Sequence, residues 1–299
     1  MVRITDKYKI TGPVPFLDVH VDRDNLLFIH PTAIRNGLEP ELSVRASARI
    51  ESFTAEIIRC RESPQMADQI KGRSLLRSGL KEPNETRLGY TRYGSRGHGW
   101  GPGLGSQLWK ALDSPLCRRG LLTSLEHLPL FVPRVGQDLI SDMTTRLAMP
   151  ELIEFTGQMV NQYPSVRRNL RKIRLTVWDE TSSRWVTRDA ELPYVSGKHL
   201  LLLPKSWVSK NLPMHPRQFY NRFTTDDVQL ERARYIEGRA LVPLKRDLHR
   251  EFPDIHDFNT TQTLKAADKG TNLVRLYDRF ADFEYSALPD EEILKRTAA

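Results

Sequence analysis

The sequence contains little cysteine and no long apolar run, and both absences narrow the class of protein. Its 299 residues include two cysteines, Cys60 and Cys117, which excludes a disulfide framework and a cysteine-rich zinc site. No run reaches the roughly 18 apolar residues of a transmembrane helix. Residues 1–16 also lack the apolar core of a signal peptide. We therefore expect a cytoplasmic protein without a membrane partner.

Acidic residues are outnumbered by basic ones, which bears on the kind of partner. Lysine and arginine total 45 against 37 aspartates and glutamates, giving a net charge of +8 and a pI near 9.5. A hydrophobic fraction of 39% with 27% charged residues is typical of a globular chain. The charge balance favours a polyanion such as nucleic acid, although charge alone supports only non-specific attraction.

The periodicity of apolar residues predicts a mixed α+β fold. Helical spacing occurs over residues 39–61, 65–78 and 138–163, with a break expected at Pro150. Strand patterns occur over residues 16–29, 128–132, 173–178, 185–192 and 199–203. The last three predict an antiparallel meander. We expect a small, mainly antiparallel sheet flanked by helices.

Strand patterns disappear after Pro204, and apolar residues then recur at helical spacing. This change predicts a mixed body over residues 1–204 and a helical, basic region over residues 205–299. The two regions are compatible with packing as one domain. The oligomeric state is left open by the sequence.

A glycine-rich stretch, LGYTRYGSRGHGWGPGLGSQLWKALD, spans Leu88 to Asp113. Glycine backbones allow N–H groups to converge on an anion, and a following helix N-terminus attracts phosphate. The stretch lacks the Gly-Lys-Ser/Thr ending of a P-loop and the spacing of a dinucleotide fingerprint. It is either a phosphate cradle, or a flexible surface loop or ordered turn cluster that binds no phosphate. The predicted phosphate-binding residues are Arg96, Gly97, His98, Gly99, Gly101 and Ser106, with Ser106 as a helix N-cap.

Carboxylates near the predicted helix at 138 point to metal chemistry. Asp138 and Asp142 are four residues apart, so they share one helix face. Glu85 is the next choice, and further acids occur at 18, 22, 24 and 82. Mg²⁺ and Mn²⁺ prefer such oxygen ligands. The competing interpretation is that Asp138 caps its helix and Asp142 is a solvated first-turn acid.

The order helix, strand, strand, strand over residues 139–205 resembles that of the PD-(D/E)xK nucleases. The acids that carry this resemblance are Glu154, Asp179, Asp189 and Glu191. The acid-x-Lys triplet itself is missing, so the resemblance requires a lysine from elsewhere, Lys198 or Lys205. The competing interpretation is an ordinary meander whose charged residues face solvent.

The segment 205–250 holds ten basic residues against five acids. The predicted nucleic-acid-binding residues are Arg217, Arg222, Arg232, Arg234, Lys245 and Arg246. Trp207, Phe219 and Tyr220 are interleaved with them, and we expect these aromatic residues mainly in the core.

These patterns together predict a metal-dependent phosphodiesterase that acts on nucleic acid, such as a bacterial nuclease for defence against foreign DNA. In this hypothesis Asp138, Asp142 and Glu85 hold Mg²⁺ or Mn²⁺, and Lys205 or Lys198 stabilises developing negative charge. Two alternatives stay open: a non-catalytic nucleic-acid-binding subunit of a larger assembly, and an enzyme that binds a nucleotide or phosphometabolite through the glycine-rich stretch.

Overall fold

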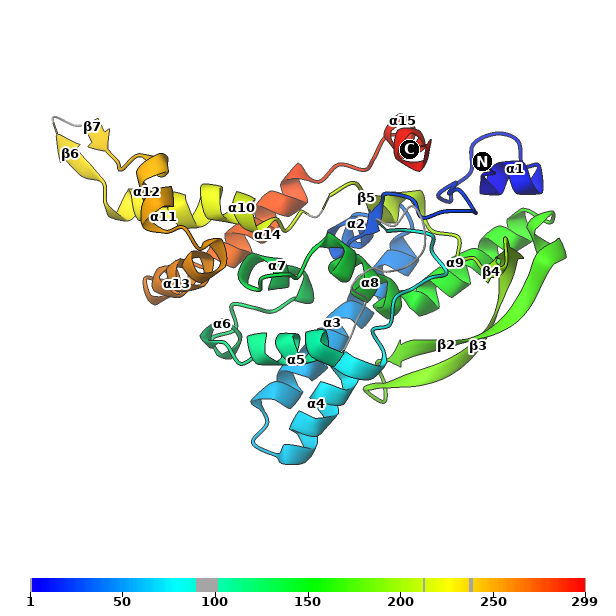
Figure 1. Ribbon diagram of the computed structural model, residues 1–299, viewed down its shortest axis with the longest axis horizontal. Helices are drawn as coiled ribbons and strands as arrows, with labels where there is room; N and C mark the ends of the chain where they lie inside the picture. The colour runs from blue at the N-terminus through cyan, green and yellow to red at the C-terminus, as the bar shows by residue number, and fades with distance from the viewer. Residues whose placement is uncertain (1, 90–101, 212, 237–238, 299) are drawn as a thin grey trace. The chain divides into compact units, whose positions relative to one another are not determined.

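The computed structural model describes residues 2–89, 102–211, 213–236 and 239–298 (Figure 1). It shows a mixed α+β protein with small antiparallel sheets and a helical C-terminal region, as the sequence predicted. Among these residues, none of the helices combines the length and the hydropathy that crossing a membrane requires.

The chain divides into two compact units, each built from separate segments. Unit 1 comprises residues 1–109, 137–212 and 286–299, and unit 2 comprises residues 110–136 and 213–285. We expected the mixed body to end at Pro204. In the structure the first unit continues to residue 212 and also includes the C-terminal residues 286–299. Residues 110–136, which we expected in the body, belong to the second unit.

Unit 1 combines helices with a long β-hairpin. Its helices are α1 (Ile4–Tyr8), α2 (Pro31–Arg35), α3 (Pro40–Glu62), α4 (Met66–Ser78), α8 (Gln137–Leu147), α9 (Met149–Gln162) and α15 (Asp290–Ala298), and α5 (Pro102–Ala111) spans the boundary with unit 2. Its strands are β1 (Phe28–Ile29), β2 (Leu170–Asp179), β3 (Arg184–Val195), β4 (Lys198–His199) and β5 (Val208–Ser209).

The hairpin of β2 and β3 is antiparallel, with Leu170 opposite Pro193 and Asp179 opposite Arg184. Aromatic rings fill the core at one end of it. The ring of Phe53 in α3 lies 4.9 Å from that of Trp178 and 5.4 Å from that of Trp185. These edge-to-face and tilted contacts bury large apolar area where the strands meet the helices.

Three helix predictions are confirmed. The segments expected at 39–61 and 65–78 form α3 and α4. The segment 138–163 is divided into α8 and α9. Pro150 lies in the first turn of α9, where its missing N–H breaks no helical hydrogen bond. The division therefore occurs just before the proline.

Several strand predictions were wrong. Residues 128–131 form a short helix, α7, because Pro129 fits the first turn of a helix. Within 16–29 the strand is limited to β1, which pairs with β5 at a distant point of the chain. The third strand of the meander is limited to the two residues of β4. Strands also occur after Pro204, in β5, β6 and β7.

Unit 2 is helical apart from one short hairpin. Its elements are α6 (Pro115–Arg118), α7 (Leu128–Phe131), α10 (Pro216–Phe219), α11 (Thr225–Glu231), β6 (Arg234–Ile236), β7 (Arg239–Leu241), α12 (Lys245–Glu251), α13 (Ile255–Asp268) and α14 (Leu273–Glu284). Tyr220, Val228, Leu248 and Phe258 form a buried cluster that joins α11, α12 and α13. Trp207 of unit 1 and Phe219 and Tyr220 of unit 2 are buried, as expected of core residues.

Candidate active site

Helix α8 places three charged residues on one face. Asp138, Asp142 and Arg146 follow each other at intervals of four residues, so they line the same side of the helix. The helix is fixed in the core of unit 1, where the Ser141 hydroxyl accepts a 3.0 Å hydrogen bond from the Ile29 amide of β1. The position of the charged face is therefore set by a buried helix.

Arg146 fastens the segment at 81–85 to α8. Its guanidinium donates hydrogen bonds of 2.5 and 2.6 Å to the main-chain carbonyls of Lys81 and Glu82. It also lies 3.5 Å from the Glu85 carboxylate. Arg146 is buried, so these charge-assisted bonds are sheltered from water. They hold Glu82 beside the acids of α8.

Asn25 joins the loop that carries Asp24 to the end of the same segment. The buried Asn25 side chain donates to the carbonyls of His20 and Arg87 and accepts from the His20 amide. Its backbone amide also donates to the Arg87 carbonyl at 2.7 Å, and the Gly89 amide returns a bond to the Asn25 carbonyl. Two distant segments are thereby paired.

Gly89 lies close to carboxylates from two segments. A β-carbon at this position would lie 3.7 Å from Asp138 Oδ1 and 4.0 Å from Asp24 Oδ2. The backbone has a φ of 138°, a conformation that favours glycine. Asp24 and Asp138 therefore approach the same point beside the backbone at the start of the glycine-rich stretch.

Glu82, Asp138 and Asp142 have raised pKa values, through burial first and neighbouring carboxylates second. Burial is the largest cause for Asp142, and the neighbouring Asp138 and Glu82 add to it, so its pKa rises to about 8 despite Arg146. The pKa of Glu82 is raised by burial, Asp138 and Asp24. The pKa of Asp138 is raised by burial and Asp24. We call Asp24, Glu82, Asp138 and Asp142 the carboxylate cluster. The interpretation of Asp142 as a solvated first-turn acid is therefore wrong.

Cationic groups surround this cluster. Burial lowers the pKa of Arg87, while Asp24 and Asp22 act in the opposite direction. The Lys198 charge partly offsets the rise in the pKa of Glu82. Together with Arg146, these residues place positive charge at the border of a negative cluster, an arrangement that suits a bound phosphate beside a cation.

Carboxylates from three segments supply the oxygen donors that Mg²⁺ and Mn²⁺ prefer. In the part of the chain that the structure describes, however, no three aspartate, glutamate, histidine or cysteine side chains are arranged to hold a metal ion. The members of the carboxylate cluster interact electrostatically without forming a set of ligands.

The glycine-rich stretch falls largely outside the described residues. Residues 90–101 are not described, and they include the predicted phosphate-binding residues Arg96, Gly97, His98, Gly99 and Gly101. Ser106 is described and lies inside α5, which begins at Pro102. The prediction of Ser106 as an N-cap was wrong, because Pro102 provides a favourable first helical position four residues earlier.

The two lysine candidates differ in their surroundings. Lys205 forms a 2.8 Å ion pair with Asp290 of α15, whereas Lys198 acts on Glu82 of the cluster. Glu85 pairs with Arg146.

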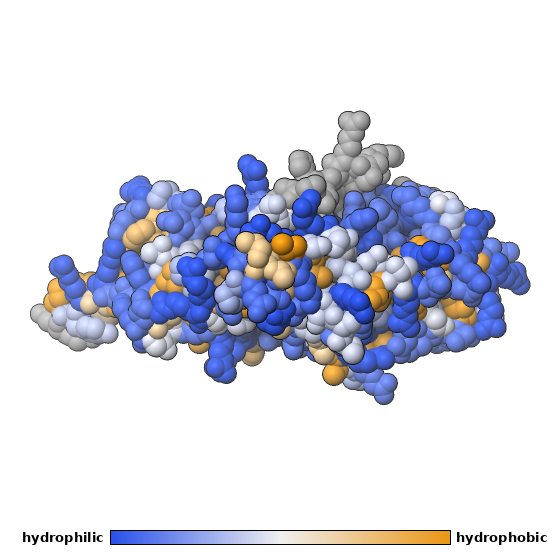
Figure 2. Space-filling model, turned by 90° about the horizontal axis from the view of Figure 1, so that it is seen from below, coloured by the Kyte–Doolittle hydropathy of each residue, from blue (hydrophilic) through white to orange (hydrophobic). Residues whose placement is uncertain are grey.

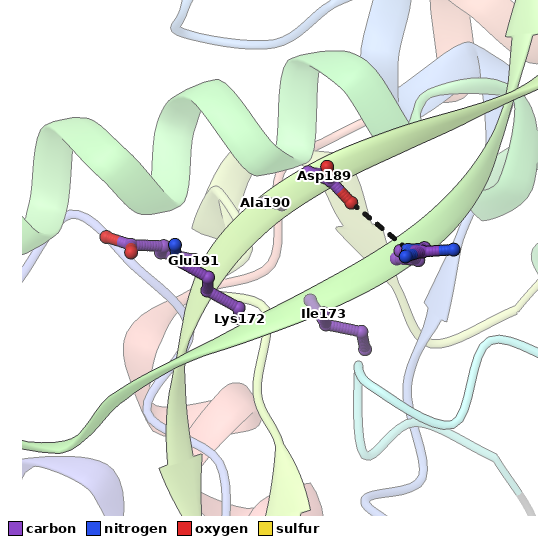
Figure 3. Close-up of a pocket in the computed structure, with 6 residues that line it drawn as sticks. Lys172, Ile173, Asp189, Ala190 and Glu191 are labelled. Atoms are coloured by element: carbon purple, nitrogen blue, oxygen red, sulfur yellow. Dashed lines mark ion pairs between the residues drawn. The ribbon is translucent and has the colours of Figure 1, made fainter.

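The acids of the nuclease-like pattern do not converge. Glu154 pairs with Arg45 at 2.8 Å, and the Asp179 carboxylate accepts from the Ser182 amide in the hairpin turn. Asp189 pairs with Arg174 at 3.6 Å in a shallow pocket on the hairpin (Figure 3). Glu191 lies beside Lys172 in the same pocket and opposite it in the ladder. This hairpin therefore matches the meander alternative.

The predicted nucleic-acid-binding residues all belong to unit 2, and several of their charges are paired. Arg232 forms two 2.7 Å bonds with Glu251, and Lys245 lies 2.5 Å from Asp226. Arg246 lies 3.5 Å from Asp247. Other members occupy α10 (Arg217), the π-helical segment Tyr220–Thr224 that follows it (Arg222, over the Phe280 ring) and β6 (Arg234).

The sequence indicated Asp24 and Glu82 only as further acids behind the preferred ligands, and it did not indicate Arg87 or Arg146 as site residues. The spacing of Arg146, four residues after Asp142, was a signal available in the sequence. The pairing of residue 25 with 87–89 had no such signal, because it depends on a buried asparagine far away in the chain.

A family profile described as a domain of unknown function, DUF8370, matches residues 9–214. The chain belongs to this family. The matched region contains the whole carboxylate cluster, the residues that fix it and the β2–β3 hairpin, and it ends where the second segment of unit 2 begins. Comparisons with curated proteins and with solved structures found no match.

Proposed function

We propose that the protein is a metal-dependent phosphodiesterase that acts on nucleic acid, with its reaction centre at the carboxylate cluster. The observation that carries this proposal is the approach of Asp24 and Asp138 to the same point beside Gly89, with Glu82 held near them by Arg146. Carboxylates brought together at the end of a glycine-rich stretch suit a divalent cation with a phosphate nearby.

Each residue has a role in this proposal. Asp138, Asp142 and Glu82 hold Mg²⁺ or Mn²⁺, which supplies an activated water and offsets the charge of the phosphate. Lys198 stabilises negative charge on the phosphate oxygens. Glu85, the third ligand in the sequence-based hypothesis, instead keeps Arg146 in place.

Carboxylates at close range repel each other, and a bound cation relieves this repulsion. The carboxylate cluster therefore has a physical reason to bind a divalent ion. The proposal includes a rearrangement in which the bound ion draws the Asp138, Asp142 and Glu82 side chains together as its ligands. The proposed setting is the cytoplasm, where the Cys60 and Cys117 thiols stay reduced.

A cleavage assay tests this function. The full chain is incubated with single- and double-stranded DNA and RNA in Mg²⁺, Mn²⁺ or EDTA, as wild type, as Asp142→Asn and as Asp138→Asn. The matched control is Asp189→Asn, which removes an exposed carboxylate from the hairpin. We expect metal-dependent cleavage that the control retains and both cluster variants lose.

Two results would overturn the proposal. Cleavage that survives in Asp142→Asn and Asp138→Asn would locate the chemistry elsewhere. Absence of cleavage on every polymer and metal, with salt-sensitive binding retained, would make the chain a nucleic-acid-binding subunit instead.

A further inference from the structure

Exposed apolar side chains are concentrated around the short hairpin of unit 2. Fifteen large apolar residues are exposed in the described part of the chain, and six of them fall between residues 230 and 244. They are Leu230, Tyr235, Ile236, Leu241, Val242 and Leu244. In Figure 2 apolar side chains lie at the left-hand end of the view, where Figure 1 places β6 and β7.

The register of the hairpin sorts its side chains into two faces. Arg234 pairs with Leu241, and Ile236 pairs with Arg239, so these four side chains share one face. Tyr235, which is 76% exposed, lies on the other face opposite Ala240. Each arginine on the first face therefore stands across from an aliphatic residue.

The two hairpin arginines differ from the basic residues around them. Arg232 and Lys245, which flank the hairpin, are paired with Glu251 and Asp226. Among the described residues, neither Arg234 nor Arg239 has an acidic partner within 4.0 Å. Within the described residues, no carboxylate neutralises these two charges.

The base of the hairpin is anchored. Helices α11 and α12, which precede and follow it, meet in the buried cluster of Val228 and Leu248. The Gln229 side chain also donates a 2.6 Å hydrogen bond to the Pro243 carbonyl. A two-stranded hairpin that is exposed on both faces gains little stability of its own, so these contacts hold its strands in position.

Charge decides between possible occupants. In a two-fold pair of chains, the face with Arg234 and Arg239 would meet its own copy, and like charges would oppose each other. A nucleic acid matches both the positive charge and the exposed apolar side chains of the hairpin, since arginines contact phosphates and apolar or aromatic side chains insert between bases.

We propose that the β6–β7 hairpin binds nucleic acid, with Arg234 and Arg239 on phosphates and Tyr235 and Ile236 against unstacked bases. This inference rests on the nucleic-acid substrate proposed above and names the element that engages it. It assigns binding to unit 2 and leaves the reaction with unit 1.

Binding is measured by fluorescence anisotropy of labelled single-stranded, duplex and forked DNA and RNA in EDTA, over a range of salt concentrations. Tyr235→Ala is expected to weaken binding about tenfold at fixed salt through loss of stacking. Arg234→Ala with Arg239→Ala is expected to reduce the slope of log affinity against log salt by about 1.5 to 2. A 2-aminopurine base should brighten with wild type and not with Tyr235→Ala.

Matched controls come from α14 in the same unit. Phe283→Ala removes an aromatic residue that is 85% exposed, and Arg275→Ala with Arg279→Ala removes two exposed arginines. These variants should bind like wild type. All the substituted side chains are exposed, and far-UV circular dichroism checks that each variant folds.

The outcomes separate this inference from the proposed function. If wild type cleaves nucleic acid and the hairpin variants bind it as tightly as wild type, the inference about the hairpin is overturned and the proposed phosphodiesterase function stands. If binding depends on the hairpin but no cleavage occurs with any metal ion, the proposed phosphodiesterase function is overturned and the inference about the hairpin stands. A dimer in sedimentation that Tyr235→Ala dissociates would show that the hairpin contacts a second copy, which would also overturn the inference.

Discussion

The Asn25 side chain donates a 2.9 Å hydrogen bond to the carbonyl of Arg87, which lies 62 residues later in the chain. This bond, with the backbone bond beside it, holds the loop of Asp24 against the segment that leads into Gly89. The carboxylate cluster exists because two loops are joined at this point.

Asn25→Ala should therefore destabilise the protein. The substitution leaves the His20 amide and the His20 and Arg87 carbonyls without their side-chain partner in a buried site, which should reduce the free energy of unfolding by about 3 kcal/mol. Urea denaturation measures this. Asn36→Ala, at an exposed asparagine with one side-chain bond to Thr32, should lose less than about 1 kcal/mol. Equal losses would contradict the anchoring role.

Asp142→Asn should stabilise the protein at alkaline pH. The folded state raises the pKa of Asp142 from 3.8 to about 8, so between these values the folded chain holds a proton that the unfolded chain has released. The stability contributed by this site is present at low pH and is lost as pH rises towards 8. Asparagine removes the titration, and we expect a gain of at least about 1 kcal/mol at pH 8 and little change at pH 4.

Thermal melting of both proteins from pH 4 to 9, without divalent ions, measures the difference. Asp189→Asn is the control, because its carboxylate is exposed on the hairpin. If wild type has the same melting temperature as Asp142→Asn at pH 8, ionisation of the Asp142 carboxyl does not destabilise the fold.

Binding of Mg²⁺ or Mn²⁺ should release a proton near neutral pH. Asp142 is mainly protonated at pH 7, and a metal ion binds the carboxylate form, so each ion bound should displace about one proton. Affinity should then increase as pH rises and level off above about 8. Isothermal titration calorimetry in two buffers with different ionisation enthalpies measures the proton number. A proton number near zero would exclude Asp142 as a ligand.

Gly89→Ala should disrupt the cluster. The φ of 138° is strained for alanine, and the added β-carbon would stand beside Asp138 and Asp24, so we expect a loss of about 1–3 kcal/mol together with loss of cleavage. Gly157→Ala is the matched control. Gly157 lies in α9 with open space around it, and alanine there should raise stability by about 0.5–1 kcal/mol. Urea denaturation and the cleavage assay measure the two effects.

Lys198→Ala and Lys205→Ala should behave differently. Lys198 acts on Glu82, so its removal should lower kcat/KM about tenfold or more. Lys205 pairs with the exposed Asp290, so its removal should leave kcat/KM nearly unchanged and alter stability by less than about 1 kcal/mol. Steady-state cleavage kinetics compare the two variants. If Lys205→Ala lowers kcat/KM more than Lys198→Ala does, Lys205 is the lysine that stabilises negative charge in the reaction.

Local patterns determined much of the secondary structure. The apolar periodicity of α3 and α4 and the position of Pro150 depend on neighbouring residues, and these predictions are confirmed. The short strands were harder to predict from the sequence, because β1 forms through pairing with β5, about 180 residues later in the chain. Residues 128–131 were apolar enough for a buried strand or a buried helix, and tertiary packing selected the helix.

The sequence by itself determined that Asp138 and Asp142 share a helix face, since a spacing of four residues fixes this in any α-helix. It also determined the basic charge and the mixed fold class. The tertiary structure decided which other charges meet that face. Asp24 and Glu82 reach it through hydrogen bonds of Asn25 and Arg146 to main-chain carbonyls. Carbonyls are common to every residue, so such bonds leave no pattern in the sequence.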